Sequence, residues 1–157
     1  MDRSAIGRIF SDLIGRPPWG VRLGEGSFLT MEFGKPEANQ SNGIVHGEWH
    51  LWLYMCMWRI ETKEKVLAGS EDDRTSIKLL LETLDFGATQ GADINLPSLD
   101  LSIRFSSGVS LTTFSCTTRS DEQWMLFTPG GNILTAYGGG AFHYGMANEP
   151  RYVRNNQ

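Results

Sequence analysis

Alternating apolar and polar residues predict β-strands over much of the chain. In the segment "LDLSIRF" at 99–105, every second side chain is apolar, as in a strand with one face in a core. Turn sequences follow such segments, with "SSG" at 106–108 and "PGG" at 129–131. Because tight turns join neighbouring strands, the pattern predicts a series of antiparallel hairpins in the C-terminal half.

Two segments have the apolar spacing of three and four residues that is typical of helices. The first lies near the N-terminus and ends at Gly15 and a proline pair. The second, at about 71–85, has a polar start after Ser70 and an apolar stripe. The stripe consists of Ile77, Leu80, Leu81 and Leu84. It predicts a helix that packs across one face of the sheet.

The segment 44–61, "IVHGEWHLWLYMCMWRIE", is rich in aromatic residues and predicts one long central strand. Side chains alternate along a strand, so its even-numbered residues from His46 to Trp58 share one face. In its second half both faces are apolar, which favours a core position. Alternatively, Trp52, Tyr54 and Trp58 form an aromatic platform for a ligand or partner. Only the polar first residues of the run are predicted to reach solvent.

Together these patterns predict an α+β fold in a single domain spanning residues 1–157. Its main element is a mostly antiparallel, curved β-sheet of six to eight strands, with one packed helix (about 71–85) and a short N-terminal helix. A chain of 157 residues can bury a core without disulfides or metals. The Gly-rich segment from about 138 predicts a loose C-terminal tail.

The net charge and the apolar content of the chain indicate which kinds of partner and which cellular compartment are expected. The formal net charge is −4 and the 14 Lys and Arg residues are dispersed, so binding to nucleic acid is not expected. No apolar stretch approaches the ~18 residues of a membrane span, and the N-terminus lacks the apolar run of a signal peptide. With two cysteines, Cys56 and Cys116, the protein is expected to be cytoplasmic with reduced thiols. The sequence leaves the oligomeric state open.

His46, Glu48 and His50 are the first candidates for chemistry, because two imidazoles and a carboxylate are common zinc ligands. On a straight strand, however, the two histidines stand about 13 Å apart, too far to share an ion. Neighbouring pairs, about 6.6 Å apart, offer only two ligands each. The alternative is that Glu48 pairs with one of the histidines. The sequence therefore assigns no metal and no cofactor.

The sequence contains no complete catalytic set. Cys56 and His50 lie about 20 Å apart along an extended strand, far beyond the contact that a nucleophile and its base require. The motif "GEG" at 24–26 precedes a strand and not a helix, so it lacks the helix N-terminus of a phosphate-binding loop. We assign no catalytic residue from the sequence, which favours a protein that is not an enzyme.

Three segments of the chain carry a family resemblance. They are "GSFLTMEFG" at 26–34, "GEWHLWLYMCMWRI" at 47–60 and "SDEQWMLFTPGGNILTAYGGG" at 120–140. Together they resemble a family of small bacterial proteins without an assigned function. The resemblance extends from about Trp19 to Tyr137 and implies a single-domain bacterial protein. It adds no catalytic residue.

The sequence thus favours a non-catalytic, protein-binding module of a regulatory or immunity type. The residues expected to contact a ligand or partner are His46, Glu48, His50 and Trp52. One alternative is a small-molecule binder that uses the His46, Glu48 and His50 end of the long strand, which requires a concave pocket there. A metal-dependent enzyme is the remaining alternative.

Overall fold

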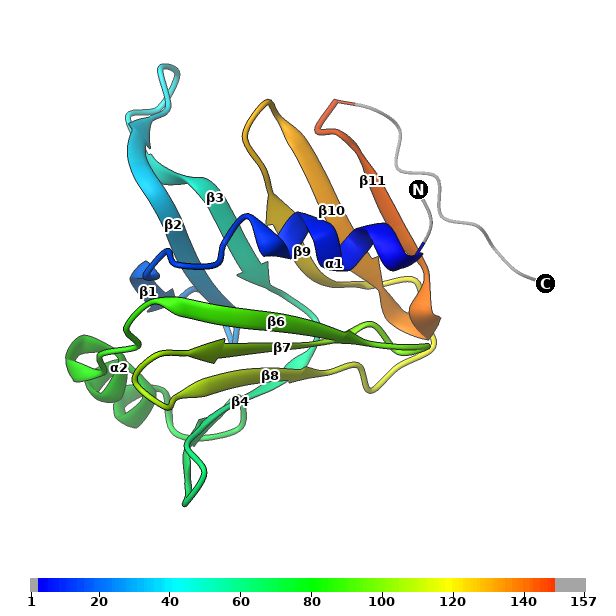
Figure 1. Cartoon of the computed structure of the whole chain (residues 1–157). Helices are drawn as coiled ribbons and strands as arrows, with labels where there is room; N and C mark the ends of the chain where they lie inside the picture. Colours follow the sequence, from blue (N-terminus) through cyan, green and yellow to red (C-terminus); the bar gives the residue numbers. More distant parts are fainter. Residues whose placement is uncertain (1–2, 149–157) are drawn as a thin grey trace.

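Two antiparallel β-sheets enclose the core in the computed structural model, which describes residues 3–148 (Figure 1). The larger sheet has the strand order β1-β2-β3-β9-β10-β11, and the smaller one has the order β5-β4-β8-β7-β6. The described residues form eleven strands and two α-helices. The predicted α+β class with antiparallel pairing is confirmed, although the strands form two sheets where the sequence predicted one of six to eight strands.

The six strands of the larger sheet come from both halves of the chain. They are β1 (Trp19–Leu23), β2 (Leu29–Ala38), β3 (Val45–Leu53), β9 (Glu122–Phe127), β10 (Asn132–Tyr137) and β11 (Phe142–Met146). The five strands of the smaller sheet come from the middle of the chain. They are β4 (Met57–Glu61), β5 (Val66–Gly69), β6 (Thr89–Asn95), β7 (Asp100–Phe105) and β8 (Ser110–Phe114). The predicted hairpins are present, since β7 pairs with β8 and β9 pairs with β10.

Alternation along the strands builds the core between the two sheets. In β2, Leu29, Met31 and Phe33 are fully buried against the smaller sheet, and β7 alternates in the same way. Each such side chain stabilises the fold by roughly 1.5–3 kcal/mol when it leaves water. The residues between them, Thr30 and Glu32 in β2, point to the outer face of the larger sheet.

The segment 44–61 forms two strands in different sheets, so the prediction of one long strand is wrong. β3 ends at Leu53, and the chain turns at 54–56 before β4 begins in the smaller sheet. Because the turn changes the sheet, it also changes which side chains point to the core. Trp52 faces outward, whereas Trp58 is buried. The long apolar run therefore reflects two strands that contribute to the same core.

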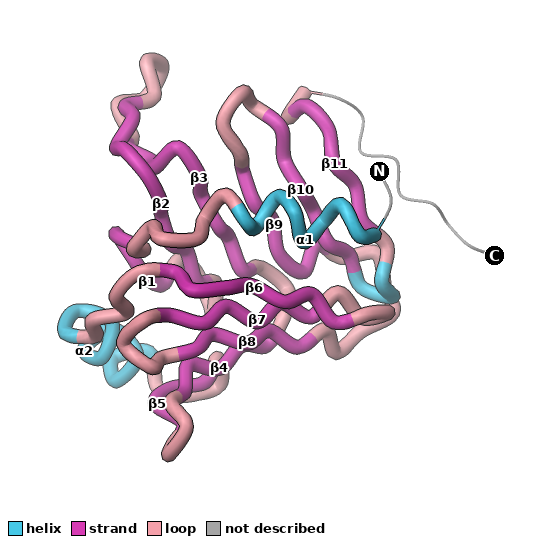
Figure 2. The backbone as a smooth tube through the Cα atoms, in the orientation of Figure 1, coloured by secondary structure: helices cyan, strands magenta, loops and turns pink. Residues whose placement is uncertain are grey.

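The hairpin of β2 and β3 extends beyond the neighbouring strands (Figure 2). Its loop is held by Asn39, whose side-chain oxygen accepts a hydrogen bond from the N–H of Ser41 at 2.9 Å. Two apolar residues at the tip, Ile44 and Val45, are 47% and 45% exposed. The hairpin thus carries exposed apolar surface at one end of the larger sheet.

Helix α1 (Arg3–Ser11) lies across the open side between the two sheets, in front of β9 and β10 in Figure 1. It packs beside β6 and buries Ile6 and Phe10. The ring of Phe10 meets that of Trp124 edge to face, with 5.6 Å between the ring centroids. The predicted N-terminal helix is therefore confirmed, and it closes the core.

Helix α2 (Arg74–Thr83) confirms the second predicted helix but begins later than residue 71. Asp73 is its N-cap, and the carboxylate accepts a hydrogen bond from the N–H of Ser76 at 3.0 Å. Ile77 is buried, and the helix packs at one end of the structure beside β1 and β5. It does not lie across β3 as the sequence predicted, which leaves the outer face of β3 open.

Residues 138–146 belong to the fold, although the sequence predicted a loose tail from about 138. Gly138–Gly140 form a short 3₁₀ turn, and β11 then pairs with β10 at the edge of the larger sheet. The remainder of the predicted tail, from residue 149, lies outside the described residues. Within 3–148 no helix has the length and apolar character needed to cross a bilayer.

Candidate functional site

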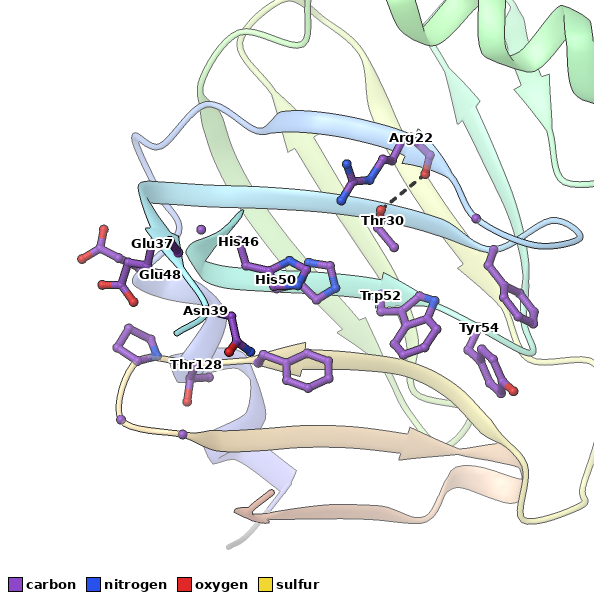
Figure 3. A pocket seen from close by; sticks show the side chains of 18 of the residues that line it. Arg22, Thr30, Glu37, Asn39, His46, Glu48, His50, Trp52, Tyr54 and Thr128 are labelled. Atoms are coloured by element: carbon purple, nitrogen blue, oxygen red, sulfur yellow. Dashed lines mark hydrogen bonds between the residues drawn. The ribbon is translucent and has the colours of Figure 1, made fainter. Parts of the chain in front are cut away.

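The outer face of β3 forms one wall of a cavity of about 980 Å³ (Figure 3). Leu51 and Leu53 point into the core, so His50 and Trp52 face outward into the cavity. The principal lining residues are Phe28, Thr30, His46, His50, Trp52, Tyr54 and Phe127. They come from three adjacent strands and their turns, so the larger sheet itself forms the site.

An aromatic cluster, consisting of Phe28, Trp52 and Tyr54, lines one end of the cavity. The ring centroids of Phe28 and Tyr54 are 4.3 Å apart, and those of Trp52 and Tyr54 are 5.3 Å apart. The three side chains are only partly buried, and Figure 3 shows Trp52 and Tyr54 following one another along the strand. This end of the cavity therefore offers ring faces and edges to a ligand.

A polar cluster, consisting of Glu32, His46 and His50, lies at the other end. The Nδ1 atom of His50 lies at hydrogen-bond distance, 2.7 Å, from Oε1 of Glu32, and Nδ1 of His46 lies 3.1 Å from the same oxygen. The other carboxylate oxygen, Oε2, accepts a hydrogen bond from the N–H of Gly47 at 2.9 Å. The cluster thus joins two strands through one carboxylate.

Glu32 is only 1% exposed, yet its hydrogen-bond partners favour the ionised form. Burial alone raises the pKa of this carboxyl, but the hydrogen bonds from His50, Gly47 and His46 outweigh burial and lower the pKa from 4.5 to about 2. An ionised carboxylate can only accept hydrogen bonds. Both Nδ1 atoms must therefore carry protons, and the Nε2 atom of each ring is left for a ligand.

A β-bulge in β2 lies beside the two histidines of β3. Phe33 pairs with Trp49, but the next paired position is Pro36 with Gly47, so three steps in β2 face two in β3. Gly34, inside the bulge, has a φ of 77°, which glycine adopts without strain. A bulge of this kind bends and twists the hairpin at the position of the polar cluster.

Glu48 lies opposite the bulge and turns away from the histidines. Its Oε2 accepts a hydrogen bond from the N–H of Lys35 at 2.9 Å and lies 3.6 Å from Nη1 of Arg16. The rings of His46 and His50, by contrast, have centroids only 4.6 Å apart. The predicted separation of about 13 Å assumed a straight strand and does not hold for these rings. Their carboxylate partner is Glu32, where the sequence suggested Glu48.

Gly47 makes the close approach of the two strands possible. A Cβ atom at this position would collide with the backbone carbonyl of Phe33. Without a side chain, the N–H of Gly47 reaches the buried carboxylate of Glu32. The absence of a side chain at Gly47 therefore allows its backbone to hold Glu32 in the polar cluster.

The structure brings together three of the four residues that the sequence predicted as contacts. His46, His50 and Trp52 all line the cavity with their rings. Glu48 lies at the rim but is engaged by Arg16 and Lys35. The sequence analysis missed Glu32. Its position in the alternating segment at 29–33 indicates an outward side chain, but the register that places it beside the histidines was not predictable.

Two further residues of the aromatic-rich run have no part in the cavity. Trp58 is buried in the core, and its Nε1–H donates to the carbonyl of Ser27 at 2.6 Å. Cys56 is also buried, and burial raises the pKa of its thiol to about 12. Cys56 is therefore a core side chain and is poorly suited to act as a nucleophile.

The comparisons with known proteins add nothing to this geometry. Neither a protein-family model, nor a curated protein, nor a solved structure matches this chain. The resemblance to small bacterial proteins stays a prediction from the sequence. The cavity and its residues are therefore the basis for the function proposed below.

Proposed function

We propose that this protein is a non-catalytic binding protein that takes a small organic molecule into the cavity on the larger sheet. The observation that carries this proposal is the cavity of about 980 Å³, which has an aromatic and a polar end on one strand. Small-molecule sites are typically concavities of roughly 300–1,000 Å³, mostly apolar, with a few fixed polar groups. The pocket required by the small-molecule alternative is present at the predicted strand.

The two ends of the cavity define the chemistry of the ligand. Trp52 and Tyr54 favour a flat apolar or sugar ring, because aromatic side chains stack on or meet such rings edge to face. The Nε2 atoms of His46 and His50 are available for hydrogen bonds with hydroxyl or amino groups. We expect a molecule with a ring at one end and polar hydrogen-bonding groups at the other, such as a monosaccharide, a nucleoside or an aromatic amine.

A protein partner is the second candidate, and one observation favours it. Ile44 and Val45 expose apolar surface at the tip of the β2–β3 hairpin, and Ala38 and Asn39 of the same hairpin line the cavity. A partner that packed on this tip would lie beside the polar end of the cavity and could insert a side chain there. In this arrangement, the protein-binding module that the sequence favoured would use the hairpin tip as its contact surface.

Tryptophan fluorescence tests the small-molecule proposal directly, because Trp52 lines the cavity. A panel of monosaccharides, nucleosides and aromatic amines, followed by a metabolite extract of the source cells, is titrated into the protein. We expect a saturable change with at least one class. The change should disappear in Trp52→Ala and weaken at least tenfold in His50→Ala, as loss of a specific ring or hydrogen-bond contact predicts.

The matched control is Leu79→Ala, which removes an exposed apolar side chain on α2 outside the cavity. This variant should bind like the wild type. Binding that survives in Trp52→Ala, or the absence of any binder in both panel and extract, would contradict the proposal. Binding of a protein that requires Ile44 and Val45 would support the second candidate instead.

A further inference from the structure

The polar cluster places three metal-ligating atoms next to one another. One atom each from Glu32, His46 and His50 lies within 4.8 Å of the other two. Oε1 of Glu32 is 2.7 Å from Nδ1 of His50 and 3.1 Å from Nδ1 of His46. Three donors of two chemical types thus converge from two neighbouring strands.

These separations are close to those of a coordination shell. Zinc bonds to imidazole nitrogen and carboxylate oxygen are about 2.0–2.1 Å long, which places tetrahedral ligands about 3.3 Å from one another. The distances from Oε1 to the two Nδ1 atoms need to grow by only a few tenths of an ångström, and the imidazole ligand atoms lie within 4.8 Å of each other. Rotation of the two rings can adjust these separations, because His46 is partly exposed and His50 lies against the open cavity.

The surroundings of the cluster support this set of ligands. Glu32 is buried, and the N–H of Gly47 holds its second oxygen, so that Oε1 is directed to both imidazoles. Such outer hydrogen bonds are a regular feature of metal ligands, because they fix the orientation of the carboxylate. The cavity on the other side leaves room for water or a ligand atom at a further coordination position.

We propose that Glu32, His46 and His50 form a binding site for one Zn²⁺ ion at the polar end of the cavity. Two imidazoles and one carboxylate suit zinc among the common divalent ions, whereas Mg²⁺ and Ca²⁺ prefer oxygen ligands alone. Binding of the ion at Nδ1 requires that this nitrogen carry no proton, so each coordinated imidazole carries its proton on Nε2.

The inference does not depend on the small organic ligand proposed above. It concerns the protein and the metal ion alone, so that either proposal can fail without the other. It also distinguishes Glu32 from Glu48, the carboxylate that the sequence suggested. Glu32 is a ligand, while Glu48 is engaged by the N–H of Lys35 and by Arg16 and is not.

Metal titration of the full, tag-free chain tests the site. After removal of metals with a chelator, Zn²⁺ is added in a calorimeter, and Co²⁺ is added as a visible spectroscopic probe. We expect the calorimeter to show one Zn²⁺ ion bound per chain. We expect the Co²⁺ form to show the visible absorption bands of an ion with nitrogen and oxygen ligands. Glu32→Gln and His50→Ala should each weaken Zn²⁺ binding by about 100-fold or more. Loss of a residue that only supports a metal ligand already costs about 10–100-fold in affinity, and these two residues are ligands themselves.

Two matched controls accompany these variants. Glu48→Gln removes the neighbouring carboxylate, and His143→Ala removes the described histidine outside the cluster. Both should bind Zn²⁺ as the wild type does. If no ion binds, or if Glu48→Gln abolishes binding while Glu32→Gln retains it, the proposed site is wrong.

A second measurement on the wild type guards against variants that fail to fold. Long-range ¹H–¹⁵N spectra of histidine distinguish a protonated Nδ1 from one that binds a metal. One equivalent of Zn²⁺ should convert the Nδ1 resonances of His46 and His50 and leave that of His143 unchanged. Unchanged resonances of His46 and His50 would overturn the proposal.

Discussion

Glu32 is a buried carboxylate on a sheet face that is otherwise open to solvent. A carboxylate that leaves water without partners is strongly disfavoured, but here three N–H groups replace the water. Two of them belong to imidazole rings and one to the backbone of Gly47. The carboxylate is therefore held in position both by the backbone of the hairpin and by the side chains of His46 and His50.

The two cysteines are expected to differ sharply in reactivity. Cys56 is buried with a pKa of about 12, so at pH 8 about one in ten thousand of its side chains is a thiolate. Cys116 is exposed. Ellman's reagent at pH 8 should therefore modify one thiol per folded chain, and the second only after unfolding in guanidinium.

The control for this experiment is Cys116→Ser, whose folded form should remain unmodified. The selectivity should persist at pH 9, because the raised pKa of Cys56 keeps the thiol protonated until the pH approaches about 12. Equal rates of modification of both thiols in the folded protein would show that Cys56 is accessible and would contradict its assignment to the core.

The β2–β3 hairpin is the element that creates the polar cluster, and Gly47 is its closest point of contact. In Gly47→Ala the new Cβ would collide with the backbone of Phe33, so the strands must separate at this position. We expect a loss of about 2–4 kcal/mol in the free energy of unfolding, which includes strain and loss of the N–H contact to Glu32. Urea denaturation followed by circular dichroism measures this value.

Gly69→Ala is the matched control, because Gly69 is also a strand glycine. A Cβ there would meet its nearest neighbour, the carbonyl oxygen of Trp58, at 3.8 Å, an ordinary contact. Its effect should stay within about 1 kcal/mol. Equal effects of the two substitutions would mean that the collision at Gly47 is relieved without separation of the strands.

The sequence predicted individual elements better than their assembly. The hairpins at β7–β8 and β9–β10 follow from alternation and turn residues, both of which are local signals. The segment 44–61 was misread because its turn at 54–56 contains neither Gly nor Pro, and a continuous apolar pattern does not show that the sheet changes. Glu32 was missed for a related reason, since the register of β2 against β3 depends on a bulge.

At the scale of the whole molecule, α1 connects the two sheets by closing the side on which they diverge. Its apolar stripe enters the same core as both sheets, and it lies beside β6 while Phe10 contacts Trp124 of β9. A helix of nine residues is too short to be stable alone in water. The helix and the two sheets therefore depend on each other for their stability.

Phe10→Ala tests this dependence. Phe10 is 1% exposed and meets Trp124, so truncation leaves a cavity between the helix and the larger sheet. We expect a loss of about 3–5 kcal/mol in the free energy of unfolding, as for other buried phenylalanines. Urea denaturation measures the loss, and the tryptophan emission of the folded protein should also shift, because Trp124 loses its neighbour.

Ile14→Ala provides the comparison, since Ile14 follows the same helix but is 55% exposed. Its effect should remain within about 0.5 kcal/mol. If Phe10→Ala were equally mild, α1 would be an accessory to the core and the two sheets would be stable without it.

The strand order of the larger sheet has a consequence for biosynthesis. β3 lies between β2, its neighbour in the sequence, and β9, which is made much later, and Phe127 at the end of β9 lines the cavity. A nascent chain leaves the ribosome with its N-terminus first, and contacts between residues that are distant in sequence form slowly. The hairpin with its polar cluster can therefore form early, but the cavity is complete only when β9 has also left the ribosome. A translation product that stops before β9 would therefore lack one wall of the cavity and, with it, the proposed binding.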